Sequence, residues 1–478
     1  MNFTKGLVPF WNDFAVDTDN TDATLSVNRP EKAGVVMQLD KAWEGSGSNF
    51  FSILHDGDIY RMYYEAWEFP TDEVYHINVC YAESTDGINW HRPSLGIFEF
   101  EGSSDNNIIM TDIPDNIAVM IDNNPACPKD HRIKAVMDGF IKDENGEPLK
   151  ALVIKASGDG IHFEQIGHVN TGYDYDSQNT LHYNEHTGKY YCYFRNNVRN
   201  RPNVGYFRET TLREIMVTES SDLVNWSEPA SLDYLGGEIY PLYTNCVSAY
   251  PFDTRYYIGF PSRYVERREW TSNYDQLAAL EFRKKRKEIN IRYALAVTDC
   301  LFMSSEDNYH FYRFDEATMT AGPENDSNWL YGDCYPAVGG VHLLPARFEG
   351  DYPELSIYAL QKNRKDQKLI ELVRHVYRID GFASYKADYR GKHLRTKAYV
   401  LEGEGISLNF RSSARGGLFV KVLDERGNVI EGYESCEYFG DSLDRKIEFE
   451  KPLSELRGKK ICFEFFIKDA ELFSMKIL

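Results

Sequence analysis

The chain has 478 residues, of which 74 are Asp or Glu and 53 are Lys or Arg, so its formal net charge is −21. A surface this negative repels phosphate groups, which makes nucleic acids and anionic membranes improbable partners. No run approaches the roughly 20 apolar residues that a bilayer span requires. The length favours two domains, and the polar N-terminus without a signal-peptide pattern predicts a cytoplasmic location.

The cysteine pattern and the aromatic content narrow the class of protein further. The eight Cys occur singly, without a CxxC spacing, which is typical of reduced thiols rather than zinc ribbons or redox motifs. The aromatic residues are 33 Tyr, 28 Phe and 7 Trp, or 14% of the chain. Such residues are enriched in β-strands, and their flat faces also suit the CH groups of sugars.

A short motif repeats along the first two thirds of the chain. Ser84-Thr-Asp-Gly-Ile-Asn-Trp90 recurs as Ser157-Gly-Asp-Gly-Ile-His-Phe163 and as Ser220-Ser-Asp-Leu-Val-Asn-Trp226, with a weaker copy at 304–311. Each copy follows a β-like run and precedes another short strand. Asp-Gly between two such runs predicts a tight hairpin, because Gly adopts the positive φ that the turn needs.

Further strand pairs stand ahead of each copy, which makes four strands per unit. The fifth unit lacks the motif and reads as Ala337–Leu344, Glu354–Lys362, Lys368–Arg374 and Ala383–Ala387. Five units of about 50–80 residues predict an all-β fold, a five-bladed β-propeller. An array of β-sandwiches with coincidental hairpins is the alternative.

The pattern changes near residue 391, where alternating strands continue without the motif. We therefore expect a propeller catalytic domain over residues 1–390, with a helical insertion at about 264–290. A small antiparallel β-sandwich follows over residues 391–478.

The inner strands of a propeller converge on a central funnel, so polar residues before those strands become neighbours. Glu44, Asp176 and Glu238 stand at such positions in three units and are the candidate catalytic carboxylates. Carboxyl groups crowded in one cleft acquire separated pKa values, as acid–base glycoside hydrolysis requires. The candidate substrate-binding residues are Trp43, Gln178, Asn179, Arg195, Tyr243, Asn245, Arg263 and Trp329.

The organisation resembles the five-bladed propeller glycoside hydrolases of families 32, 43 and 68. Six strings also resemble uncharacterised bacterial proteins assigned to this superfamily: Trp43-Glu-Gly45, Tyr60-Arg-Met-Tyr-Tyr64, Asp176-Ser-Gln-Asn179, Leu242-Tyr-Thr-Asn245, Phe260-Pro-Ser-Arg-Tyr264 and Arg378-Ile-Asp-Gly-Phe382. The resemblance implies a base or nucleophile at Glu44, a positioning role for Asp176 and a general acid at Glu238. The invertase-type Asn-Asp-Pro-Asn-Gly and Arg-Asp-Pro strings are missing, and Glu44 replaces the usual Asp.

Three functions remain open. The first is a glycosidase that removes terminal sugars from short oligosaccharides. The second is a glycoside phosphorylase, in which Arg132, Arg195 and Arg263 would form a phosphate pocket. The third is a carbohydrate-binding propeller without catalysis. No cofactor or metal site is predicted, since the calcium found in the funnel of relatives has no decisive ligand cluster in this sequence.

Overall fold

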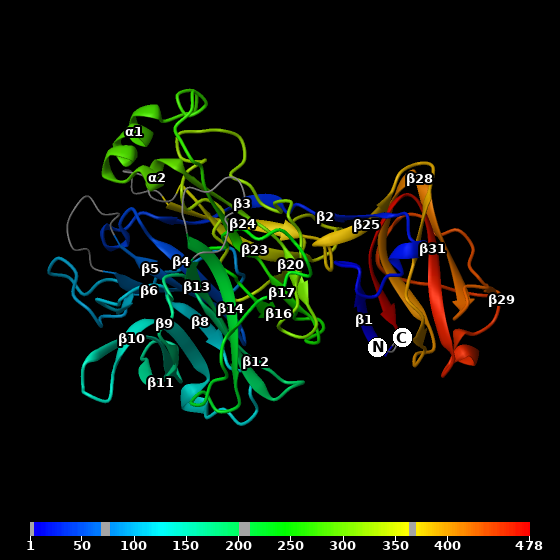
Figure 1. The fold of residues 1–478 in the computed structure, drawn as a ribbon, viewed down its shortest axis with the longest axis horizontal. Helices are drawn as coiled ribbons and strands as arrows, with labels where there is room; N and C mark the ends of the chain where they lie inside the picture. The colour runs from blue at the N-terminus through cyan, green and yellow to red at the C-terminus, as the bar shows by residue number, and fades with distance from the viewer. Residues whose placement is uncertain (1–3, 68–76, 200–210, 363–369) are drawn as a thin grey trace. The chain divides into compact units, whose positions relative to one another are not determined.

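The computed structural model describes residues 4–67, 77–199, 211–362 and 370–478. It contains five antiparallel sheets of propeller type and one larger antiparallel sheet (Figure 1). The predicted five-bladed propeller is therefore confirmed. All eight cysteines are free thiols.

Each blade of the propeller is a meander whose first strand lies innermost. Blade one consists of β4 (Asn49–Asp56), β5 (Ile59–Ala66), β6 (Asn78–Ser84) and β7 (Ile108–Met110). Blade two consists of β8 (Ala118–Ile121), β9 (Ile133–Lys142), β10 (Pro148–Ser157) and β11 (Glu164–Thr171). Blade three consists of β12 (Thr180–Asn184), β13 (Lys189–Arg199), β14 (Thr211–Ser220) and β15 (Ala230–Ser231).

Blade four is interrupted on its second and third strands. Its sheet consists of β16 (Ser248–Ala249), β17 (Tyr257–Gly259), β20 (Met303–Ser305) and β21 (Tyr312–Arg313), and the pair β18 (Ser262–Glu266) and β19 (Ala296–Cys300) extends it. Pro261, which cannot donate to a ladder, lies between β17 and β18. Helices α1 (Leu280–Ile289) and α2 (Ile291–Leu295) connect β18 to β19, within and just beyond the expected insertion.

Blade five is closed by a strand from near the N-terminus. It contains β22 (His342–Leu344), β23 (Glu354–Gln361), β24 (Ile370–Tyr377) and β3 (Glu31–Leu39), and β3 pairs antiparallel with β24. The fourth strand predicted at Ala383–Ala387 was wrong. That segment forms β25, which pairs with β2 (Thr24–Val27) and β31 (Lys460–Ile477) in the other unit.

The repeated motif forms the connection between the third and fourth strands of blades one to four. In the first copy, Ser84 Oγ accepts the backbone N–H of Gly87 at 2.9 Å, and Asp86 Oδ1 accepts those of Ile88 and Asn89 at 2.8 and 2.7 Å. The result is a wider loop held by side chains, not the tight hairpin that we predicted. Blade five needs no such connection, because its fourth strand, β3, comes from near the N-terminus of the chain.

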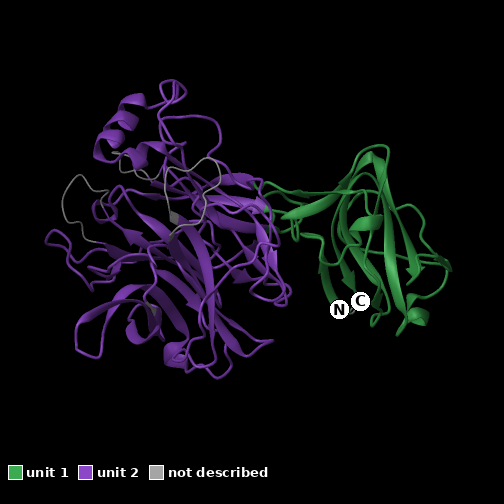
Figure 2. Cartoon of the chain, in the orientation of Figure 1, with its two compact units in different colours: residues 1–30, 346–354, 377–478 green, residues 31–345, 355–376 purple. Residues whose placement is uncertain are grey.

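The chain forms two compact units, the propeller and a second unit (Figure 2). The propeller unit comprises residues 31–345 and 355–376, and the second unit comprises residues 1–30, 346–354 and 377–478. This division differs from the expected boundary at residue 390. The reason is that β1 (Gly6–Pro9) and β2 pair with β31 and β25, so the first residues of the chain complete the C-terminal sheet.

The second unit is one antiparallel sheet of nine strands around its own hydrophobic core. Its remaining strands are β25 (Ala383–Ala387), β26 (Lys392–Arg395), β27 (Tyr399–Val400), β28 (Ile406–Asp424), β29 (Val429–Glu434) and β30 (Asp441–Lys446). Leu408, Phe410, Phe463 and Phe465 are fully buried in this core. Short 3₁₀ helices occur at Thr18–Asn20, Ala42–Glu44, Lys129–His131 and Leu453–Leu456.

The direction of the inner strands defines two ends of the propeller. We call the end at which the inner strands begin the mouth end. Connections from the fourth strand of one blade to the first strand of the next lie there, as do those between second and third strands. The α1–α2 insertion belongs to the mouth end, because it joins the second strand of blade four to the third.

Candidate active site

Carboxyl groups from three consecutive blades gather at the mouth end. Glu65 lies near the end of β5, Asp138 lies on β9, and Asp115, Asp174 and Asp176 lie in the connections that lead to β8 and β12. The negative charges of Asp176 and Asp138 both raise the pKa of Asp115, and those of Asp176 and Asp174 raise the pKa of Asp138. Asp115 and Asp176, which are 61 positions apart in the sequence, are thus electrostatic neighbours. We call these five residues the carboxyl cluster.

Two members of the carboxyl cluster, Glu65 and Asp115, raise or lower each other's pKa values. The Glu65 side chain is fully buried, and its Oε1 accepts the backbone N–H of Ile117 at 2.8 Å. Its Oε2 is buried without a hydrogen-bond partner among the described residues, and its carboxyl group interacts electrostatically with that of Asp115. Burial, then the charge of Asp115, raises the pKa of Glu65 well above its usual range, and burial, then the charge of Asp176, raises the pKa of Asp115 to about 7. Such a pair keeps one proton near neutral pH.

Asp138 is the third buried carboxyl group. It is 5% exposed, and burial raises its pKa to about 6, although Lys150 Nζ lies 3.1 Å from Asp138 Oδ2 and opposes that shift. The same amine lies 3.9 Å from Asp174. Lys150 therefore compensates part of the negative charge on this side of the cluster.

Arg195 holds the two remaining carboxylates. Its side chain is 1% exposed, and Nη2 lies 3.1 Å from Asp174 Oδ1 and 3.2 Å from Asp176 Oδ2. Burial opposes ionisation of Asp174, but the charge of Arg195 and the backbone N–H of Asp176 outweigh it and lower the pKa of Asp174. The Asp176 side chain is 53% exposed, so a ligand can reach it. A proton-holding pair thus lies beside an accessible carboxylate, the arrangement that acid–base chemistry requires.

Aromatic rings from blade one and from the connections to blades four and five support the cluster. The Arg195 guanidinium carbon lies 5.5 Å from the ring centroid of Tyr243. Tyr243 stacks on Phe50 and Tyr335, with centroid distances of 6.4 and 5.5 Å and interplanar angles of 20°. These rings are almost fully buried. They therefore hold Arg195 in place more than they offer a face to a sugar.

Three of the predicted site residues come together here, namely Asp176, Arg195 and Tyr243. The predicted amides lie directly behind them and are bonded within the protein. Gln178 Nε2 donates to the carbonyls of Phe51 and Ile117 at 3.0 and 3.1 Å. Asn179 Oδ1 accepts the Arg195 backbone N–H at 3.0 Å, and Asn245 Oδ1 accepts the Thr180 hydroxyl at 2.7 Å. Gln178 and Asn245 therefore brace neighbouring blades, and Asn179 braces blade three itself.

Glu44 and Trp43 lie away from the carboxyl cluster. Glu44 is 0% exposed, and its Oε1 accepts the Tyr64 hydroxyl at 2.6 Å and Arg92 Nε at 2.7 Å. Its Oε2 accepts Arg92 Nη2 at 3.2 Å and the Lys41 backbone N–H at 2.9 Å. Trp43 Nε1 donates to an Asn107 side chain at 2.7 Å. Glu44 is thus the acidic half of a buried, hydrogen-bonded ion pair.

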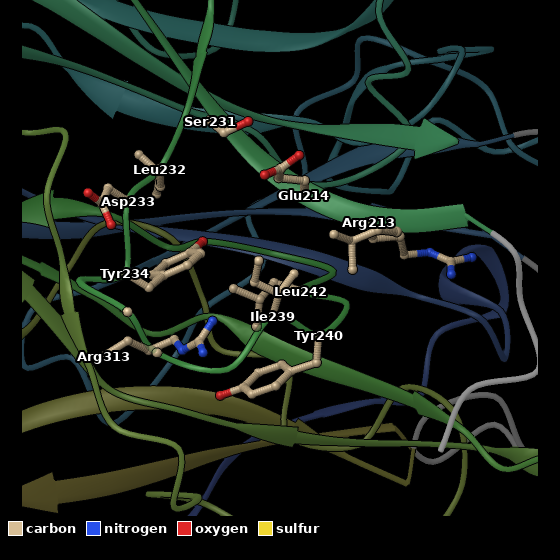
Figure 3. Close-up of a pocket in the computed structure, with 13 residues that line it drawn as sticks. Arg213, Glu214, Ser231, Leu232, Asp233, Tyr234, Ile239, Tyr240, Leu242 and Arg313 are labelled. Atoms are coloured by element: carbon tan, nitrogen blue, oxygen red, sulfur yellow. The ribbon is translucent and has the colours of Figure 1, made fainter. Parts of the chain in front are cut away.

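Glu238 and Arg263 belong to the boundary between blades three and four. Glu238 is exposed in the loop over a pocket of about 390 Å³, where the Arg313 guanidinium lies between the rings of Tyr234 and Tyr240 (Figure 3). Arg313 donates to the Glu238 carbonyl. Arg263 forms a two-point ion pair with Asp299, at 2.9 and 2.5 Å.

Trp329 lines a different pocket, of about 440 Å³, together with Tyr274 and residues of the segment before α1. Its ring is 36% exposed, and Nε1 donates to the Gly322 carbonyl at 2.9 Å. The structure therefore gathers Asp176, Arg195 and Tyr243 at one place and distributes Glu44, Glu238, Arg263 and Trp329 elsewhere.

Sequence reasoning missed Glu65, Asp115 and Asp138. The inner strand of blade two is β8, and Asp115 lies in the connection that leads to it. Asp115 precedes β8 as Asp176 precedes β12, so recognition of the short run Ala118–Ile121 as a strand would have found it.

Within residues 4–67, 77–199, 211–362 and 370–478, no group of three His, Cys, Asp or Glu side chains has the arrangement of a metal site. No helix in that part of the chain is long and apolar enough to span a bilayer.

Comparison with known proteins gives structural relatives only. The sequence matches no protein-family model and no curated protein. Among solved structures, sucrose-6-phosphate hydrolase from Lactobacillus gasseri is 13% identical, with 93% of each chain covered and a TM-score of 0.37. An α-L-arabinofuranosidase from Fusarium graminearum is 12% identical, with 74% of this chain and 99% of that chain covered and a TM-score of 0.40.

A third structure comes from the GH130 family of mannoside phosphorylases, which contains glycoside hydrolases that target β-1,2-mannosidic linkages in Candida mannan. It is 14% identical, with 80% of this chain and 99% of that chain covered and a TM-score of 0.41. The five-bladed propeller itself follows from the sheet topology of the structure.

Proposed function

We propose that this protein is a glycoside hydrolase that removes terminal sugars from short oligosaccharides at the mouth end of the propeller. The observation that carries the proposal is the carboxyl cluster. It combines a buried pair that keeps a proton near pH 7 with a carboxylate that is more than half exposed. Glycoside hydrolysis needs both groups on opposite sides of the scissile bond.

The cluster supports a division of roles. Asp115, which is partly exposed and has a pKa of about 7, donates a proton to the leaving glycosidic oxygen as the C–O bond breaks. The Asp176 carboxylate acts on the opposite side, either taking a proton from the attacking water or bonding to the anomeric carbon. Arg195 orients Asp176 by their 3.2 Å ion pair. Burial and the charge of Asp176 keep Asp115 protonated, whereas the interaction with Glu65 lowers the pKa of Asp115 and opposes them.

The arginines favour water over phosphate as the attacking group. Arg132 contacts Asp56 at 2.6 and 2.7 Å, and Arg263 contacts Asp299 in the same two-point manner. Arg195 lies between Asp174 and Asp176. Each of the three arginines expected to bind phosphate is therefore already neutralised by a carboxylate.

A panel of nitrophenyl glycosides of arabinose, xylose, galactose and fructose-like furanosides, assayed with and without inorganic phosphate, tests the proposal. We expect phosphate-independent turnover that Asp115→Asn and Asp176→Asn each reduce by about 10²–10⁴-fold. Glu164→Gln, the same chemical change at a 73% exposed carboxylate of blade two, is the matched control and keeps full activity.

Two outcomes would overturn the proposal. Strict dependence on phosphate would make the protein a phosphorylase. Saccharide binding that survives both Asp variants, with turnover detectable in none of the proteins, would make it a binding propeller.

A further inference from the structure

A further cavity extends toward the end of the propeller opposite the mouth. Its volume is about 550 Å³, and residues on or beside the inner strands of all five blades line it. The contributors include His55 of β4, Ile121 of β8, Tyr183 of β12, Ala249 of β16 and His342 of β22. The cavity is therefore axial, and it is built from different residues than the carboxyl cluster.

The basic side chains in the wall of this axial cavity are three histidines, His55, His182 and His342. Although 27% of the chain is Asp, Glu, Lys or Arg, none of the described residues that line the cavity is of these types. Burial lowers the pKa values of His182 and His342 to about 4, so both imidazoles are neutral at physiological pH. A charged ligand would lose its hydration here without gaining a counter-charge.

The wall does offer neutral hydrogen-bonding groups and flat surfaces. Asn123 is exposed at the rim, and the Ser248 hydroxyl is buried without a hydrogen-bond partner among the described residues. The His55 imidazole stacks on Tyr60 with a centroid distance of 4.3 Å, and Phe252 is 46% exposed. Gly340 packs closely against Ser248, because a Cβ at this position would lie 2.7 Å from Ser248 Oγ.

We propose that this axial cavity binds an uncharged mono- or disaccharide, at a site separate from the carboxyl cluster. Neutral donors and acceptors match sugar hydroxyls, and the aromatic and imidazole faces match the CH groups of a pyranose. The volume lies within the range of small-molecule sites. Binding in this cavity requires no catalysis at the mouth end, so its test is independent of the test of the proposed hydrolase activity.

Met120 lines the cavity and provides a direct probe, because its ¹³C-labelled methyl resonance reports occupancy while the other methionines serve as internal controls. The full chain carrying Asp176→Asn, which disables turnover, is titrated with glucose, xylose and maltose. We expect saturable shifts of the Met120 resonance at millimolar concentrations. Glucuronate, which adds a charge to the same ring, should bind at least about tenfold more weakly because its carboxylate must be desolvated.

Variants at the exposed rim avoid damage to the fold. Phe252→Ala and Asn123→Ala should each weaken binding by about five- to tenfold, through loss of a ring contact and of an amide hydrogen bond. Phe348→Ala, at an exposed Phe of the other unit, is the matched control and leaves affinity unchanged. A Met120 resonance that no neutral saccharide moves would overturn the proposal. So would equal affinity for glucuronate, or unchanged affinity in both rim variants.

Discussion

Replacing Arg92 with Met separates a structural role of Glu44 from a catalytic one. Arg92 contacts both carboxylate oxygens of Glu44, at 2.7 and 3.2 Å, and Glu44 is completely buried. The substitution keeps much of the side-chain volume but leaves a buried carboxylate without its counter-charge. We expect a large loss of stability and little change in turnover by the folded protein.

The size of the effect follows from the burial of the pair. Removing one partner of a buried ion pair costs about 3–5 kcal/mol. Unfolding of the roughly 340-residue propeller unit carries an entropy on the order of 0.7 kcal/mol/K. The melting temperature of the propeller should therefore fall by about 4–7 °C.

Differential scanning calorimetry measures this shift, and kcat at 25 °C gives the activity. The double variant Glu44→Leu/Arg92→Met should recover most of the lost stability, because replacing both partners with apolar side chains removes the unpaired charge. The reasoning is refuted if Arg92→Met keeps its melting temperature but loses activity, since Glu44 would then act on the substrate.

Three further predictions concern other parts of the propeller. Glu238→Gln should keep kcat within about twofold, because its exposed side chain is remote from the carboxyl cluster; a loss of 10²-fold or more, as expected for a general acid, would restore the role implied by family resemblance. Ser157→Ala should lower stability by about 1–2 kcal/mol in urea unfolding, because Ser157 Oγ accepts the Gly160 N–H at 2.8 Å; an unchanged midpoint contradicts this. Asp138 has a folded-state pKa of about 6 against a usual 3.8, so its protonated form stabilises the fold below pH 4 and this stabilisation is lost as the pH rises through 6. As the pH rises through that interval, the melting temperature of Asp138→Asn should rise relative to that of the wild-type protein. Parallel curves of melting temperature against pH for the two proteins would exclude the raised pKa of Asp138.

The blade repeat was predictable because it is local. The side-chain oxygens of Ser and Asp accept backbone N–H groups two or three residues later in the same loop. The same residues therefore recur in the connections between third and fourth strands. Closure of blade five was not predictable in this way. It depends on pairing between β3 and β24, which are more than 330 residues apart. No motif in either strand indicates that they pair.

The candidate site was predictable in kind but only partly in its residues. Asp176 and Glu44 both stand near the start of an inner strand, yet one is more than half exposed and the other has no exposed surface. That difference arises from Tyr64 on β5 and Arg92 in the β6–β7 connection, which both contact Glu44. Asp115 was missed because β8 has only four residues, too few for a clear alternating pattern.

The pH dependence of kcat/KM, compared between the wild-type protein and Asp138→Asn, tests the carboxyl cluster most directly. Activity of the wild-type protein should fall as the pH rises through about 7, when Asp115 loses its proton. Asp138→Asn removes a negative charge that raises the pKa of Asp115, so the fall should begin at lower pH. An alkaline limb that is absent near pH 7, or that stays in place in the variant, would contradict a proton held by Asp115 at the mouth of the propeller.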